Sequence, residues 1–383
     1  MSAATHGMPA SATAPHDEAE LAAFIAERHA MARPLQITGG GTRLQADGVE
    51  PQDQLSTRNL SGIVTYEPGS LTLIARTGTP IGEIETALAA EGQALAFEPM
   101  DHRPLLGTTG TPTIGGIVSA NVSGPRRVQA GACRDYVLGV RFVDGRGRII
   151  KNGGRVMKNV TGLDLGKVMS GAHGTLGVLT EVAFKTLPMA EAQQTLAFPG
   201  LSVAAAVQLF STALGTPFEV CGAAFHEGTA WLRIEGLEPQ VVYRRERLMG
   251  LFSNHEIEML DDAASRTLWR GLRDVQHLAG GHDPVWRILT KPGDAPVIAS
   301  ALEALGGQCA LDWGGGLIWY RGPADASSVR KAAGAGHAFV VRRAHLPATV
   351  IFPAEPRAVT DLSRALRKTF DPAGLFNPGL MGN

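Results

Sequence analysis

Apolar and polar positions recur at helical or alternating spacing along most of the chain, which predicts a mixture of helices and strands. Near the start, Leu21, Phe24 and Ile25 share one helical face, with Asp17 in the N-cap position. Further elements follow from β-rich alternation and from turn or cap residues. The predicted elements are helices over 17–30, 79–91 and 359–368 and strands over 34–38, 71–77, 136–143, 149–151 and 177–186.

Local signals refine these elements and divide the chain. We expect Thr79 to cap the second helix with Pro80 in its first turn, and Asp144-Gly145 to join two strands. After Pro188 the glycine density falls and helix and strand patterns alternate, which indicates a domain boundary. The predicted divisions are a disordered tail, a first domain, a second domain and a C-terminal segment that returns to the first, over 1–16, 17–190, 191–345 and 346–383.

Composition excludes several classes of protein. A length of 383 residues suits two domains, and a net charge of −1 without long charge runs argues against nucleic-acid binding. The three cysteines are too scattered for a disulfide framework or for iron–sulfur or zinc ligands, so a reducing, cytoplasmic setting fits best. No signal peptide and no run of about 18 apolar residues is present, so no transmembrane segment is expected.

Glycine is the informative excess, with 47 residues concentrated in three segments. At 38–43, Thr-Gly-Gly-Gly-Thr-Arg can converge backbone N–H groups on an anion, although it can equally be a flexible turn. It lacks the spacing of Rossmann and Walker motifs. At 112–126, paired glycines lie among small polar residues, which suits either a ligand site or a packing helix that stops at Gly-Pro. At 156–181, Gly174 and Gly177 bracket a turn that leads into a strand.

Taken in order, these segments and the terminal Phe-Asn-Pro-Gly resemble the FAD domain of the vanillyl-alcohol oxidase/PCMH flavoprotein superfamily. The stretches at 124–127, 134–139, 156–165 and 312–316 are most similar to the smaller, E-type FAD-binding subunits of bacterial glycolate oxidases. This resemblance implies an α+β fold: a PCMH-type FAD-binding domain of two αβ subdomains, and an α+β cap domain with an antiparallel sheet.

The resemblance also implies cofactor contacts in every segment. These are Ile37, Thr38, Gly39, Gly40, Gly41, Thr42 and Arg43 at the pyrophosphate, Thr109, Thr113, Ile114, Gly115, Gly116, Ser119 and Asn121 at the pyrophosphate and isoalloxazine, Gly124, Pro125, Arg126, Arg134 and Asp135 along the flavin, and Gly174, Gly177 and Val178 at the adenosine or ribityl portion. Arg126 or Arg134 is implied at the N1/C2 carbonyl edge, although arginines more often form surface or interdomain salt bridges.

Two departures from related proteins shape the functional reading. Members with covalent flavin carry histidine where this chain has Gly41, so noncovalent FAD is expected. Related 2-hydroxy-acid dehydrogenases hold a metal with two histidines, and the comparable segment 311–319 of this chain lacks both. Histidines spaced like His277 and His282 more often lie on a solvated loop than bind a metal. No metal is therefore expected. Catalytic residues stay unassigned among the charged residues of the second domain, which include Arg287, Lys291, Arg342, Arg343 and His345.

Three hypotheses follow for the function. The favoured one is an FAD-binding subunit of a glycolate oxidase complex, working beside a larger FAD-binding catalytic subunit and an iron–sulfur subunit on a small 2-hydroxy acid. The complex would be cytoplasmic, or peripheral at the inner membrane through its partners. The second is a self-sufficient lactate or glycolate dehydrogenase. The third is a non-catalytic scaffold with a vestigial flavin fold.

Overall fold

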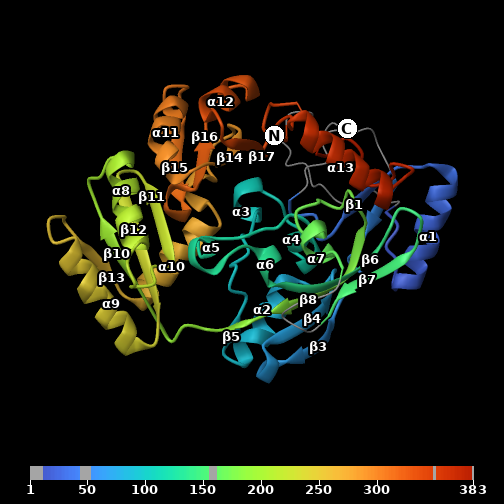
Figure 1. Ribbon diagram of the computed structural model, residues 1–383, viewed down its shortest axis with the longest axis horizontal. Helices are drawn as coiled ribbons and strands as arrows, with labels where there is room; N and C mark the ends of the chain where they lie inside the picture. The colour runs from blue at the N-terminus through green and yellow to red at the C-terminus, as the bar shows by residue number, and fades with distance from the viewer. Residues whose placement is uncertain (1–11, 44–52, 155–161, 348–350, 382–383) are drawn as a thin grey trace.

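The structure, a computed structural model, describes residues 12–43, 53–154, 162–347 and 351–381. Two antiparallel sheets with their helices lie side by side (Figure 1). The first has the order β3–β4–β8–β6–β7, with β3 (Ile63–Glu67), β4 (Thr72–Arg76), β8 (Val178–Lys185), β6 (Val137–Val143) and β7 (Ile149–Gly153). Its helices are α2 (Ile81–Ala90), α3 (Arg103–Leu106), α4 (Ile114–Ser119), α5 (Arg127–Ala130), α6 (Cys133–Tyr136) and α7 (Leu165–Met169).

The second sheet is built from the later half of the chain. Its order is β13–β10–β12–β11–β15–β16–β14–β17, with β13 (Glu258–Leu260), β10 (Ala192–Phe198), β12 (Thr229–Gly236), β11 (Gly222–His226), β15 (Gln308–Asp312), β16 (Leu317–Arg321), β14 (Val285–Leu289) and β17 (His337–Arg342). Its helices are α8 (Val203–Leu214), α9 (Glu238–Leu251), α10 (Asp262–Arg273), α11 (Ala295–Glu303) and α12 (Ala326–Ala333). A short pair, β5 (Gln93–Ala94) with β9 (Leu187–Pro188), precedes β10 along the chain.

Side chains of the second sheet alternate between two cores, as the two-residue period of a strand requires. On β14, Trp286 and Ile288 pack in the core of α8, α9, α11 and α12, whereas Val285 packs in the core shared with the first sheet. On β16, Tyr320 and Trp319 divide in the same way. Because one core contains residues from both halves, the inner face of the second sheet forms a fixed wall beside the first half.

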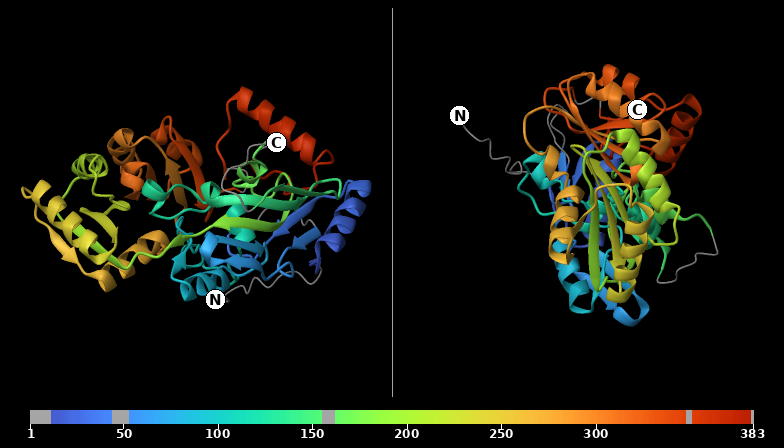
Figure 2. Two further views of the ribbon diagram at one scale, coloured as in Figure 1. Left: turned by 60° about the horizontal axis from the view of Figure 1, so that its bottom comes forward. Right: turned by 90° about the vertical axis from the view of Figure 1, so that its left-hand side faces the viewer.

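The C-terminal segment returns to the N-terminal part of the chain. Helix α1 (Glu18–Met31) precedes β1 (Leu35–Thr38), which pairs in parallel with β2 (Asp53–Ser56). The N–H of Leu35 donates to the carbonyl of Leu375 at 2.7 Å, so the chain end adds to the edge of β1. Helix α13 (Arg357–Phe370) leads into this segment and lies at the periphery of the molecule (Figure 2).

A buried ion-pair network also joins the two halves. Arg233 on β12, with only 2% of its side chain exposed, donates to both carboxylate oxygens of Glu98 at 2.9 Å and lies 3.1 Å from Glu235. The Arg233 and Arg126 cations hold the pKa of Glu98 below its usual range, although burial alone would raise it. Both partners are thus ionised at neutral pH, and neither can be removed without leaving a buried charge.

The structure corrects three local expectations. Pro80, not Thr79, is the N-cap of α2, because the Thr79 hydroxyl donates to the carbonyl of Arg76 instead. The β6–β7 connection is a five-residue loop, since the ladder ends at the pair of Val143 and Ile149. Thr13, expected in a disordered tail, exchanges backbone hydrogen bonds with β2. Residues 1–11 of that tail, and the part of the third glycine-rich segment at 156–161, lie outside the described residues.

Candidate functional site

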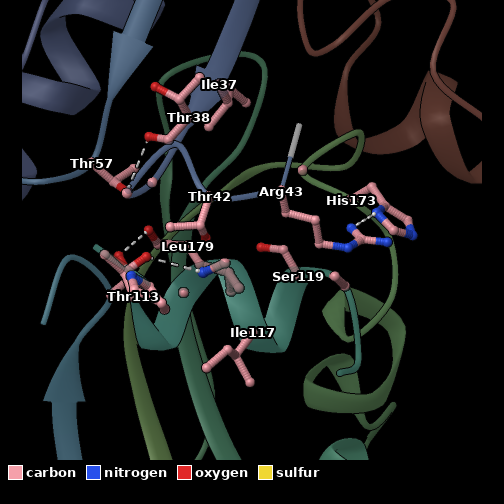
Figure 3. Close-up of a pocket in the computed structure, with 18 of the residues that line it drawn as sticks. Ile37, Thr38, Thr42, Arg43, Thr57, Thr113, Ile117, Ser119, His173 and Leu179 are labelled. Atoms are coloured by element: carbon pink, nitrogen blue, oxygen red, sulfur yellow. Dashed lines mark hydrogen bonds between the residues drawn. The ribbon is translucent and has the colours of Figure 1, made fainter. Parts of the chain in front are cut away.

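A cavity of about 930 Å³ lies between the loop after β1, helix α4 and the turn before β8 (Figure 3). The lining combines all three glycine-rich segments with the C-terminal segment. The predicted contacts that line it are Ile37, Thr38, Gly39, Gly40, Gly41, Thr42, Arg43, Thr113, Gly115, Gly116, Ser119, Gly174, Gly177 and Val178.

The loop after β1 presents backbone donors to this cavity. Within the described ranges, no hydrogen bond is donated by the N–H groups of residues 39–42. Gly41 has a φ of +73°, a left-handed conformation that favours glycine, and no atom would lie within 4 Å of a Cβ there. Successive unpaired N–H groups of this kind form an anion site that suits a pyrophosphate.

The amides of helix α4 are not equivalent donors. Ile114 and Gly115 donate their N–H groups to the carbonyls of Thr79 and Thr77, at 3.0 and 2.8 Å. The hydroxyl of Thr113, the N-cap residue, accepts a hydrogen bond from the N–H of Gly116 at 3.4 Å. The glycine loop therefore offers the cavity N–H donors that the start of α4 does not.

The glycines of the cavity have two separate structural roles. A Cβ on Gly40 would lie 1.5 Å from the carbonyl oxygen of Thr111, and one on Gly115 would lie 2.6 Å from a neighbouring side chain. Gly40 thus lets the first segment pack against the backbone that leads into the second, and Gly115 lets the second pack against Thr77, which follows β4. A Cβ on Gly116, by contrast, would meet only Thr113 Oγ1 at 3.5 Å, an ordinary contact, and would point into the cavity that Gly116 lines.

Arg43 and His173 form a contact at one end of the cavity. Arg43 Nη1 lies 3.0 Å from His173 Nδ1, as the dashed line in Figure 3 marks. Burial beside this cation holds the pKa of His173 well below its usual range, so the imidazole is neutral and accepts the hydrogen bond. Burial lowers the pKa of Arg43 only to about 10, and the guanidinium stays charged at neutral pH.

Asn377, from the terminal Phe-Asn-Pro-Gly, positions this end of the cavity. Its Oδ1 accepts from the N–H of Ile37 at 2.7 Å, and its Nδ2 donates to the carbonyl of His173 at 2.8 Å. The backbone N–H of Asn377 donates to Leu35 at 2.9 Å. One buried amide side chain thus fixes β1 against the turn of the third segment.

The other predicted contacts lie away from this cavity. Ile114 is fully buried in the core beneath α4, and Pro125 is also buried. Thr109 is exposed on the loop before α4 and lines neither this cavity nor the second one described below. Asn121 and Gly124 line the second cavity.

The predicted flavin-edge arginines form other contacts. Arg126 lies 3.4 Å from Glu235 in the buried ion-pair network. Arg134 has 51% of its side chain exposed, and the carboxylate of Asp135 accepts from the N–H of Ala132. None of the three lines either cavity, because salt bridges, solvent and a local cap satisfy them. The cations that do line the cavities include Arg43 and, in the second cavity, Arg273 and Arg287.

The second cavity, of about 470 Å³, adjoins the first and reaches the inner face of the second sheet. The residues common to both are Arg43, Met100, His102, Ala120 and Val122. Burial, with nearby arginines, lowers the pKa of His102 to about 3, so its ring is neutral. Sequence reasoning missed Met100 and His102, because neither lies in a recognisable motif. Arg287 was one of several charged residues of the second domain to which the sequence assigned no role. The signal that could have singled it out is its position among the apolar residues of β14.

Comparisons with known proteins agree with this geometry. Residues 9–153 match a family described as an FAD binding domain. The chain is 34% identical over 361 residues to the glycolate oxidase subunit GlcE of Escherichia coli (strain K12), covering 91% of this chain and 92% of that protein. The chain belongs to the family of this subunit. FAD is accordingly its cofactor, and its fold is that of the vanillyl-alcohol oxidase/PCMH flavoproteins.

More distant relatives share part of the chain or the fold alone. Glycolate oxidase subunit GlcD of Bacillus subtilis (strain 168) is 30% identical over 207 residues, 53% of this chain and 42% of that protein. The solved structure of an alkyldihydroxyacetonephosphate synthase has a TM-score of 0.67 at 15% identity, covering 96% of this chain and 76% of its own. That of a chitooligosaccharide oxidase has a TM-score of 0.64 at 16% identity, covering 96% and 90%. No helix in the described part is long and apolar enough to cross a membrane.

Proposed function

We propose that this chain holds FAD noncovalently in the larger cavity and works in glycolate oxidation as one subunit of a complex. The observation that carries the proposal is the loop at 39–42, whose N–H groups line the cavity and donate to no acceptor in the part of the chain that the structure describes. Position 41, where a covalent histidine would stand, has no side chain and lies at the cavity. The family relationship to a glycolate oxidase subunit supports the reaction.

The two cavities suit different parts of this reaction. The glycine loop and Arg43 would hold the diphosphate, and the adjoining cavity would place a substrate against the inner face of the second sheet. FAD, when bound, supplies the hydride acceptor for a 2-hydroxy acid. The residues of this chain bind and orient the reactants, and the predicted boundaries at 190 and 345 would separate the FAD domain from the cap.

Anaerobic addition of glycolate to the co-purified complex tests this function. The flavin absorbance near its visible maximum is expected to bleach, since reduced flavin loses that band. The same addition to the isolated chain separates the first two hypotheses, because a self-sufficient dehydrogenase would bleach without its partners. A complex whose flavin stays oxidised under glycolate contradicts the proposed reaction.

Helix α13 supports a protein partner. Val359, Leu362 and Leu366 lie on one helical face and are 44%, 65% and 37% exposed. The side facing the body contains the half-buried Thr360 and Ser363 and ends at Phe370, whose ring packs on Phe142. An exposed apolar stripe on a helix fits an apolar groove on another protein. We assign it to the larger FAD-binding subunit, whose groove would need an acidic rim, because Arg357, Arg364, Arg367 and Lys368 outnumber Asp361 on this helix.

Replacing Leu362 and Leu366 together with aspartate is expected to lower recovery of the co-expressed larger subunit by roughly tenfold or more. The reason is that two charges would be buried against the partner's groove. Val297→Asp is the matched control, because Val297 is 75% exposed on α11 and belongs to a different surface. Equal recovery from the double variant and the control would contradict this interface.

The iron–sulfur subunit is a further part of the proposal. Cys133, Cys221 and Cys309 are free and buried at separate places along the chain, and burial raises the pKa of each thiol well above its usual range. These thiols are unsuited to ligating one cluster, because they are protonated and far apart in the fold. An iron–sulfur centre of the complex would therefore come from another chain.

A further inference from the structure

The second cavity contains an arginine without an anionic partner. Arg287 points from β14 to the inner face of the sheet, and its guanidinium carbon lies 4.9 Å from the ring centroid of Trp313 and 5.4 Å from that of Phe339. Within the described ranges, no carboxylate lies within ion-pair distance of Arg287, and its side chain donates no hydrogen bond to a protein acceptor. Two aromatic rings therefore hold a cation whose donors are unused.

The neighbouring charges show why this cation is distinct. Arg273 also lines the cavity, but it donates to both carboxylate oxygens of Asp274 at 2.8 and 3.0 Å. Burial, with Arg127 and Arg43 nearby, lowers the pKa of Arg287 to about 9, so it stays protonated at neutral pH. Arg287 is half-buried, and within the described residues it has no anionic partner, so an anion bound beside it would remove much of the cost of desolvating this cation.

One carboxyl group faces the same cavity. Asp312 is buried at the end of β15, and its Oδ1 accepts from the N–H of Trp313 at 2.7 Å. Burial raises the pKa of Asp312 to about 7, against the opposing effects of that hydrogen bond and of Arg233. Near neutral pH the group is therefore only partly ionised, and it does not cancel the charge of Arg287.

We propose that Arg287 binds the carboxylate of the small 2-hydroxy acid, without a metal ion. This rests on the proposed function and names the residue that selects the substrate class. The planar guanidinium offers parallel N–H donors that match a carboxylate, and Trp313 and Phe339 fix its plane. Leu317, Trp319 and Val341 supply apolar walls around it.

Isothermal titration calorimetry with oxalate on the purified full-length chain tests the assignment. Arg287→Met is expected to weaken oxalate binding roughly 10- to 100-fold, the range for a lost hydrogen-bonded charge pair. The oxalate affinity of Arg287→Lys should lie between those of Arg287→Met and the unmodified chain, because lysine keeps the positive charge but loses the two parallel N–H donors of the guanidinium. Arg247→Met is the matched control: Arg247 lies 5.0 Å from the ring of Tyr243 on α9, another arginine–ring contact, and does not line the cavity. That variant should stay within about twofold of the unmodified chain.

Asp312→Asn is expected to change the oxalate affinity in the opposite direction, toward tighter binding. The groups facing Asp312 include Arg287, Arg233 and Glu98, and its own ionisation grows as pH rises through about 7. At pH 8 the carboxylate repels oxalate, so the asparagine variant should bind it more tightly than the unmodified chain. At pH 6 the difference should nearly vanish, because the carboxyl is then mostly neutral.

The outcomes separate this proposal from FAD binding. A chain that retains FAD and binds oxalate equally well with Met or Arg at 287 overturns the proposal, and so does a chain that retains FAD and binds no oxalate. Weaker binding confined to the 287 variants, with unfolding temperatures near that of the unmodified chain, supports it. A chain that binds oxalate through Arg287 but retains no FAD supports the anion site and contradicts the proposed function.

Discussion

Replacing Gly116 with valine is expected to give a folded chain that no longer retains FAD. Its Cβ would point into the larger cavity and meet no backbone, so the helix can accept the side chain. Valine also has a higher helix propensity than glycine, by a few tenths of a kcal/mol. The added methyl groups would occupy space that the cofactor needs. Flavin absorbance per chain after gel filtration should fall to near zero, while the circular dichroism spectrum stays unchanged.

Gly82→Val is the matched control for this variant. Gly82 lies early in helix α2, as Gly116 does in α4, and a Cβ there would meet nothing within 4 Å. It does not line the cavity. The control should retain its flavin, and a Gly116→Val chain that is as yellow as the control would show that FAD lies elsewhere.

Gly40→Ala is expected to lower the stability of the chain by more than about 3 kcal/mol, because overpacking against backbone cannot relax by rotation of a side chain. The new methyl would lie 1.5 Å from the carbonyl oxygen of Thr111, whose own N–H donates to Gly40. The two glycine segments would have to separate. Thermal unfolding, followed by circular dichroism in the absence of added FAD, measures the loss.

A neighbouring glycine provides the comparison. Gly41 has a positive φ and open space around it, so Gly41→Asn should cost less than about 1 kcal/mol. If Gly40→Ala unfolds at the same temperature as Gly41→Asn, the close backbone packing described above is wrong. Comparing the two variants thus distinguishes Gly40, which close backbone packing requires, from Gly41, whose positive φ favours glycine.

Sequence reasoning could single out the segments that line the larger cavity, because their signal is local. Each of the three glycine-rich segments can be recognised from a few consecutive residues, and each contributes residues to the lining of the cavity. What sequence could not show is which glycine faces a ligand and which faces another backbone. Gly115 and Gly116 are adjacent, yet only the structure shows that a Cβ on the first would collide and one on the second would not.

The arginines predicted at the flavin edge show where sequence reasoning fails. Arg126 is the last residue of the second segment, but its partner Glu235 is more than a hundred positions away on β12. Long-range pairing of this kind leaves no local pattern, so the sequence could not show that Arg126 lies in a buried ion-pair network and lines neither cavity. Arg287 was hard to single out for the same reason, because Trp313 and Phe339 reach it from two other parts of the fold.

The most direct test of noncovalent FAD in this cradle is the absorbance spectrum of the purified chain before and after acid precipitation. We predict a yellow protein that releases FAD into the supernatant, close to one per chain, and leaves a colourless pellet. A colourless chain, or flavin that stays in the pellet, would contradict the account.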